Sequence, residues 1–409
     1  MSSGGHPAGA ATTFDIRPLL FAGTACTMAM MAFVAVVAPV ARVLGLQPWQ
    51  AGVTVTVSGA LWMLLARAWG SASDRHGRRT MLLFGVAGVC VAYAALCLAV
   101  DVSLRLRPAL AWAFMALVLT RGAVGAFYAA IPAIGQALVA DHVPPQRRAG
   151  AMASLGAANA VGLVLGPAAA AGLAQISLSA PLYGMAVLPL LAWVVLWRAL
   201  PREPVRAASD LPPVRLADAR LRRPMAVAFV AMFGVGVAQI TVGFYALDRL
   251  GLDAAAAARV AGIALTLVGV ALVLAQLLVR RLALTPQRMI RIGGVVAACG
   301  FGAIVWVGTT WGLWACYFVA AAGMGWVFPA FSALAANAVE PHEQGTTAGS
   351  IGAAQGLGMV AGPLIGTLLY AAGPAVPYLL VALMLLVMAL WPAASPQVKP
   401  GASAWQSPD

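Results

Sequence analysis

The sequence predicts an all-α membrane protein with twelve transmembrane helices, arranged as two pseudo-symmetric bundles of six. Of its 409 residues, 62% are hydrophobic and only 9% are charged, whereas about a quarter of the residues of a soluble domain carry charge. Apolar runs of about twenty residues, long enough for a helix to cross a bilayer, recur along the whole chain. A pattern of glycine and amide residues from the first half also returns in the second half. These observations exclude a soluble enzyme or binding domain.

Twelve apolar segments are expected to cross the membrane, with short polar turns between them. Four of the longer segments contain an internal proline that predicts a bend, namely Pro132, Pro167, Pro329 and Pro363, because proline cannot donate the backbone hydrogen bond of a helix interior. In chain order, the segments lie at residues 18–41, 50–69, 80–100, 108–139, 149–175, 180–199, 225–247, 257–279, 289–308, 312–338, 346–372 and 375–393.

The longest polar interruption divides these segments six and six. Residues 1–17 are expected to be a leader without a signal peptide, since no basic region precedes an apolar one. Residues 18–199 then form the first bundle, 200–224 a linker, 225–393 the second bundle and 394–409 a tail. No further folded domain fits in the linker, although a short surface helix at 214–221 does.

An internal repeat supports the division into halves. The run that begins at Gly156 returns at Gly352, an offset of 196 residues, with glycine, amide and proline at matching places. Related halves are typical of transporters built from repeats. The matched residues are Gly156, Asn159, Gly162, Gly166 and Pro167 in the fifth segment, and Gly352, Gln355, Gly358, Gly362 and Pro363 in the eleventh.

The distribution of positive charge predicts the orientation. Most Lys and Arg residues fall in the leader, the linker, the tail and the turns on one side of the predicted layout. By the positive-inside rule, that side and both termini are cytoplasmic, in a bacterial inner membrane. The net charge of +13 is then explained by a basic face against anionic lipid, without nucleic acid as a partner. The five cysteines lie in apolar runs at irregular spacing, which indicates core packing and neither disulfides nor a metal site.

A charged stretch between the second and third segments carries the most specific motif. Its pattern, G-x-x-x-D-R-x-G-R-R, is read from Gly70, Asp74, Arg75, Gly77, Arg78 and Arg79. It resembles the signature loop of the major facilitator superfamily of secondary transporters, except that Ala72 stands where leucine is frequent. The resemblance implies the major facilitator fold and alternating access.

The same stretch is a candidate gate. Asp74 is expected to pair with Arg78 and to accept from amides at a helix N-terminus near residues 346–347. Glu340 and Glu343 are candidate partners for its arginines across the two halves, in contacts that would break as the bundles rock. The alternative is a solvated turn that only enforces topology.

Two further patterns resemble motifs of the same family. Gly162, Gly166 and Pro167 resemble the antiporter motif G-x-x-x-G-P-x-x-G-G, with alanines in place of its last two glycines; simple close packing of small residues is the alternative. Arg121 resembles the arginine of the fourth-helix motif. An arginine inside an apolar span is expected to face a water-filled cavity or a partner, unless it reaches the membrane surface. The resemblance gives it a role in proton coupling or in holding an anionic substrate.

No carboxylate falls in the middle of a predicted span, which favours neutral or anionic cargo over cationic drugs. Asp248, at the end of the seventh segment, is the nearest alternative proton carrier, or else an exposed helix-end acid beside Arg249. The arrangement of the family suggests residues that line the central path, and helix packing is the alternative role for each of them. They are Tyr128, Asn159, Gln239, Tyr245, Trp326 and Gln355.

The sequence therefore predicts proton-coupled export of a small amphipathic molecule by a monomeric transporter that is not an enzyme. No cofactor is expected, since no G-x-x-x-x-G-K-[ST] phosphate loop is present for ATP. One alternative is siderophore export, because residues 239–248 resemble bacterial siderophore exporters. The other is a proton-coupled nutrient importer on the same fold.

Overall fold

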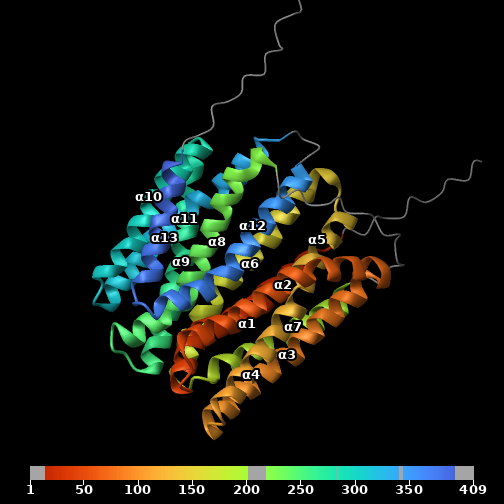
Figure 1. Cartoon of the computed structure of the whole chain (residues 1–409). Helices are drawn as coiled ribbons and strands as arrows, with labels where there is room; N and C mark the ends of the chain where they lie inside the picture. The colour runs from red at the N-terminus through yellow and green to blue at the C-terminus, as the bar shows by residue number, and fades with distance from the viewer. Residues whose placement is uncertain (1–13, 201–217, 283, 340–343, 392–409) are drawn as a thin grey trace, which may run out of the picture.

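The computed structural model describes residues 14–200, 218–282, 284–339 and 344–391, and every regular element in these ranges is a helix (Figure 1). The first half contains α1 (Arg17–Val43), α2 (Pro48–His76), α3 (Arg78–Leu106), α4 (Leu110–Tyr128), α5 (Ala130–His142), α6 (Pro145–Leu173) and α7 (Ala180–Ala199). The second half contains η1 (Ala219–Leu221), α8 (Arg222–Asp248), α9 (Ala254–Leu282), α10 (Pro286–Ala303), η2 (Ile304–Trp306), α11 (Thr310–Ala336), α12 (Gln344–Tyr370) and α13 (Val376–Leu390).

The helices match the predicted spans. Within the described ranges, eleven helical segments are long and apolar enough to cross a membrane, and Val376–Leu390 is a shorter apolar helix. Large apolar side chains also cover the outside of the molecule, for example Val91, Trp112 and Leu383, as expected of a surface that faces lipid. The predicted fold class is confirmed. The predicted linker lies mostly in residues 201–217, outside the described residues, so the boundaries of the two halves stay a prediction.

The fourth predicted span is not one continuous helix. It divides at Ala129 into α4 and α5, which together cover Leu110–His142. The cause is Pro132, since it has no N–H to donate to the carbonyl four residues earlier. By contrast, α6, α11 and α12 continue through Pro167, Pro329 and Pro363.

The two halves repeat the same helix contact. In the first half, α6 packs on α1: a Cβ on Gly162 would lie 2.8 Å from the Thr24 carbonyl oxygen. In the second half, α12 packs on α8, where a Cβ on Gly358 would lie 2.4 Å from the Phe229 carbonyl oxygen. Glycine permits these close approaches because it has no side chain. The 196-residue repeat thus corresponds to an equivalent helix pair in each bundle.

The halves meet along α1, α2 and α6 of the first bundle and α8, α9 and α12 of the second (Figure 1). We call the end at which α2 meets α3 the motif end, and the end at which α1 meets α2 the opposite end. Small residues bring the bundles into close contact at the opposite end. There, a Cβ on Gly243 would lie 2.7 Å from the Ala38 Cβ, and one on Gly262 would lie 2.6 Å from the Pro167 carbonyl oxygen.

Candidate functional site

The charged motif is more helical than its sequence suggests. Instead of a turn across residues 70–79, α2 continues to His76 and α3 begins at Arg78, with only Gly77 between them. Gly77 adopts a φ of 90°, in a region that a side chain disfavours. The charged residues before it extend the helix because Arg75 and His76 lie in its last turn, where positive charge is favourable.

Arg78 is the centre of an ion-pair network at the motif end. Its Nη2 pairs with Asp74 one helical turn earlier, as predicted, and its Nε lies 3.0 Å from Oδ2 of Asp141 on α5. Its Nη1 donates to Ser73 Oγ at 2.7 Å, and the neighbouring Arg79 donates to the Trp197 carbonyl of α7 at 2.5 Å. The motif therefore ties together four helices of the first bundle.

The predicted contact of Asp74 with the helix N-terminus near residues 346–347, in the second half, stays a prediction. Glu340 and Glu343, the candidate partners on that side, belong to the part of the chain that the structure does not describe. The gate at the motif end accordingly stays a prediction. Gly70 faces open space, so nothing in this arrangement requires a glycine there.

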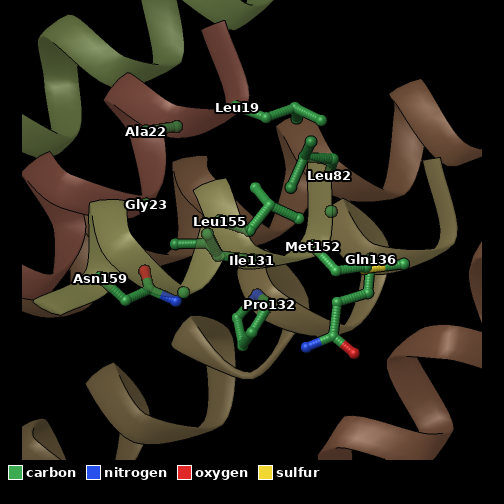
Figure 2. Close-up of a pocket in the computed structure, with 12 residues that line it drawn as sticks. Leu19, Ala22, Gly23, Leu82, Ile131, Pro132, Gln136, Met152, Leu155 and Asn159 are labelled. Atoms are coloured by element: carbon green, nitrogen blue, oxygen red, sulfur yellow. The ribbon is translucent and has the colours of Figure 1, made fainter. Parts of the chain in front are cut away.

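A pocket of about 330 Å³ lies in the first bundle toward the motif end (Figure 2). Four helices line it, α1, α3, α5 and α6, and their contributions are mostly apolar. Its polar side chains are the amides of Asn159 and Gln136, which lie on opposite sides of the pocket (Figure 2). None of its twelve lining residues is ionisable; they are Leu19, Ala22, Gly23, Leu82, Ile131, Pro132, Gly135, Gln136, Met152, Leu155, Gly156 and Asn159.

Asn159 is positioned by a chain of hydroxyl groups behind the pocket. Thr27 of α1 lies 2.7 Å from the Tyr128 hydroxyl and donates to Asn159 Oδ1 at 3.4 Å. Thr24 donates to the Ala158 carbonyl at 2.9 Å, which fixes the same turn of α6. Tyr128, which we expected to face the substrate path, is buried and supports the pocket from behind, whereas Asn159 lines it.

The antiporter-like residues of α6 act as contact surfaces in this structure. A Cβ on Gly166 would lie 2.7 Å from the Met28 carbonyl oxygen, so α6 follows α1 closely through both Gly162 and Gly166. On another side of α6, the Pro167 carbonyl approaches Gly262 of α9 in the second bundle. The motif residues therefore pack α6 against α1 within the first bundle and, through the Pro167 carbonyl, against α9 of the second bundle.

Arg121 lies in the middle of the first bundle with an exposure of 0%. It neither lines the pocket nor reaches the surface; of the expected settings, the structure shows contacts with partners inside the bundle. Its Nη2 donates a long hydrogen bond of 3.4 Å to the Met30 carbonyl, and its guanidinium lies 5.2 Å from the centre of the Phe33 ring. Within the described part of the chain, its Nε and Nη1 have no hydrogen-bond partner. The sequence could not show this burial because the segments around it are apolar on every face.

The remaining cavity candidates belong to the second bundle. Tyr245 has the packing role that was the alternative expectation: its hydroxyl is buried and lies 2.8 Å from the carbonyls of Ile304 and Val307, where α10 ends. Trp326 packs against the core of the second bundle beside Gly293. Gln239 and Gln355 are half-buried on α8 and α12 and do not line the pocket.

One ion pair between the bundles was not predicted from the sequence. Asp248 at the end of α8 binds Arg42 at the end of α1, with Arg42 Nη2 at 2.5 and 2.6 Å from the two carboxylate oxygens. We expected Asp248 to be either a proton carrier or an exposed acid beside Arg249. The available signal was the predicted layout, which places Arg42 and Asp248 at the same end of the molecule with opposite charges.

Comparison with known proteins agrees with this architecture. The family model described as "Major Facilitator Superfamily" matches residues 19–358 and 260–407. The chain is 28% identical over 337 residues to "Tetracycline resistance protein, class C" of Escherichia coli, covering 78% of this chain and 80% of that protein. It is 25% identical over 334 residues to the class G protein of Vibrio anguillarum, with the same coverage. The crystal structure of "the human organic anion transporter MFSD10 (TETRAN)" superimposes with a TM-score of 0.63 at 20% identity, covering 91% and 98% of the two chains.

The chain therefore belongs to the Major Facilitator Superfamily and is a multi-pass membrane transporter. Among the described residues, no group of three or more His, Cys, Asp or Glu side chains could hold a metal ion. The candidate site is thus the pocket with its amides, the buried Arg121 and the charged motif.

Proposed function

We propose that this protein exports a small amphipathic molecule across a bacterial inner membrane, driven by protons moving inward. The observation that carries the proposal is the pocket, which combines apolar walls with amides on two sides and no ionisable side chain. Such a site suits a molecule that buries apolar surface and forms a few hydrogen bonds. The similarity to two tetracycline resistance proteins supports drug export as the direction of transport.

The motif end is the cytoplasmic side in this proposal. Arginines gather there on several helices, including Arg17, Arg75, Arg78 and Arg79, as the positive-inside rule requires. The bundles touch closely at the opposite end, and the pocket lies toward the motif end. This arrangement fits the stage of the cycle at which substrate enters from the cytoplasm. Rocking of the bundles would then release it on the other side.

Arg121 is the proposed coupling residue. A buried cation with few partners is sensitive to any change in its surroundings, and it lies in the same bundle as the pocket. Because Arg121 does not line the pocket, it does not serve as a direct anchor for an anionic substrate in this arrangement. The pocket thus offers no cation to an anionic siderophore, and we rank siderophore export below export of an uncharged or zwitterionic molecule.

The proposal is tested in everted bacterial membrane vesicles, in which export appears as accumulation. With an inward-acidic pH gradient, vesicles containing the protein should accumulate tetracycline and should lose this activity when the gradient is collapsed. Ethidium, which is permanently cationic, and a catecholate siderophore serve as contrasting probes. Accumulation in intact cells instead would support the importer alternative. Absence of gradient-dependent accumulation of every probe, in vesicles with normal amounts of protein, would contradict export.

Asn159→Leu provides the site-directed arm of this test. The change keeps a similar size but removes the amide from the pocket wall, so the apparent KM for the transported probe should rise about tenfold. Asp101→Asn, far from the pocket in an ion pair with Arg105 of the same helix, should leave transport unchanged. Equal effects of both changes would indicate a general defect and not a binding role.

A further inference from the structure

We propose that Arg42, Asp248 and Tyr370 form a latch that holds the opposite end of the transporter closed and must break for that end to open. The three residues come from the ends of α1, α8 and α12, so the latch joins the first bundle to two helices of the second. It rests on the alternating access assigned above, but it is independent of the cargo and of the direction of transport.

The geometry is that of a specific ion pair. A single nitrogen of Arg42, Nη2, lies within 2.6 Å of both carboxylate oxygens of Asp248. The Tyr370 hydroxyl donates to Oδ2 of the same carboxylate at 3.2 Å. Phe244, one helical turn before Asp248, lies under the Arg42 guanidinium at 5.9 Å and beside the Tyr370 ring at 5.9 Å. The carboxylate thus receives hydrogen bonds from both bundles, and aromatic rings hold its partners in place.

The backbone contact below the ion pair explains why these residues control opening. Gly243 and Ala38 bring α8 and α1 into direct contact about one turn from the ion pair. If the bundles rock apart at the opposite end, α1 and α8 separate along this line. Arg42 and Asp248 lie at its outer limit, where the separation is large, so their hydrogen bonds cannot survive the movement.

The exposure of the pair sets the strength of the latch. The side chains of Arg42 and Asp248 are 43% and 31% exposed, so water can solvate both charges as soon as they separate. Partly exposed ion pairs contribute modestly to stability. The latch therefore biases the equilibrium between closed and open forms without locking the protein in one of them, which a transport cycle requires.

The same exposure argues against Asp248 as the proton carrier. A residue that carries a proton through the membrane must exchange it with each side in turn. Asp248 lies at the opposite end and is solvent-accessible there even while the bundles touch at that end. In this proposal, the Asp248 carboxylate holds that end closed, and groups deeper in the bundles couple transport to proton movement.

The test measures conformation directly on the purified full-length protein in lipid nanodiscs, without substrate. The five cysteines are replaced, and pairs of spin labels are attached at exposed positions. Val43 on α1 with Arg259 on α9 reports the opposite end; Ser71 on α2 with Arg288 on α10 reports the motif end. Pulsed electron paramagnetic resonance then gives the ratio of closed to open populations from the label distances.

Arg42→Gln and Asp248→Asn should each lower the closed-to-open ratio at the opposite end about three- to tenfold, with the motif-end pair moving closer together. The double variant should resemble either single one, because both remove the same interaction. Tyr370→Phe should have an effect of about twofold. Exchange of the charges, Arg42→Asp with Asp248→Arg, should restore much of the closed population. This double variant tests the latch even where a single variant folds poorly, because it keeps an ion pair between the two helices.

Asp101→Asn is the matched control, since Asp101 lies at the same end but its partners, Arg105 of α3 and Ser179 beside α7, both belong to the first bundle. An unchanged population ratio in Arg42→Gln and Asp248→Asn, or an equal change in Asp101→Asn, would overturn the latch. If the label distances respond as expected while vesicles show no export of any probe, the latch stands and the proposed direction of transport falls.

Discussion

Replacing the buried arginine with a neutral side chain of similar length, Arg121→Met, should separate stability from function. Arg121 is fully buried, and among the described residues it has one hydrogen bond of 3.4 Å, the Phe33 ring at 5.2 Å and no ion pair with a carboxylate. A buried charge in such a setting costs several kcal/mol. Methionine fills similar space and carries no charge, so its introduction removes this cost.

The losses on replacement are small by comparison. The long hydrogen bond and the cation–π contact together contribute about 1–3 kcal/mol. Relief of the unpaired charge more than offsets them, and we expect Arg121→Met to be more stable by roughly 1–3 kcal/mol. Because the same substitution removes the proposed coupling group, proton-driven transport should be lost. A stable protein without transport would show that this arginine is retained for function at a cost in stability.

Two measurements on the same variant check both expectations. Intrinsic tryptophan fluorescence during heating in detergent reports unfolding, and vesicle accumulation reports transport. Arg105→Met is the control, since Arg105 is exposed and pairs within its own helix; it should leave both properties nearly unchanged. A clear loss of stability in Arg121→Met would show that the charge is compensated inside the bundle. Normal gradient-dependent transport would refute the coupling role.

The sequence was sufficient to predict most of the fold because each span is a long apolar run of its own. The glycines that repeat between halves also identified an equivalent helix contact, in which Gly162 and Gly358 face the backbones of α1 and α8. These predictions depend on local composition and on the internal repeat of the sequence. The position of the break at Ala129 followed less directly, since Pro132 indicated a bend but not the residue at which the helix divides.

The site was harder to predict because apolar helices carry little information about which face turns inward. In α1 every residue from 29 to 41 is buried, so hydrophobic periodicity cannot orient this helix. Arg121 could therefore be recognised as unusual, but its full burial could not be foreseen. The pairing of Arg42 with Asp248 depends on where two bundles meet, and no local pattern of a single sequence records that distance.

Four further substitutions test the packing around the motif, the helices and the pocket. Gly77→Ala should lower stability by about 1 kcal/mol in thermal unfolding, because the φ of 90° disfavours a side chain. Gly125→Leu should prevent folding, seen as aggregation in size-exclusion chromatography, since a Cβ there would lie 2.1 Å from the Ser58 carbonyl oxygen. Tyr245→Phe leaves two buried carbonyls without their shared donor, so it should cost about 1–3 kcal/mol while the KM for substrate stays unchanged. Tyr128→Phe removes a hydroxyl behind the pocket and should instead raise the KM for substrate. A raised KM in Tyr245→Phe with an unchanged KM in Tyr128→Phe would place the substrate path beside Tyr245 and contradict the pocket as the binding site.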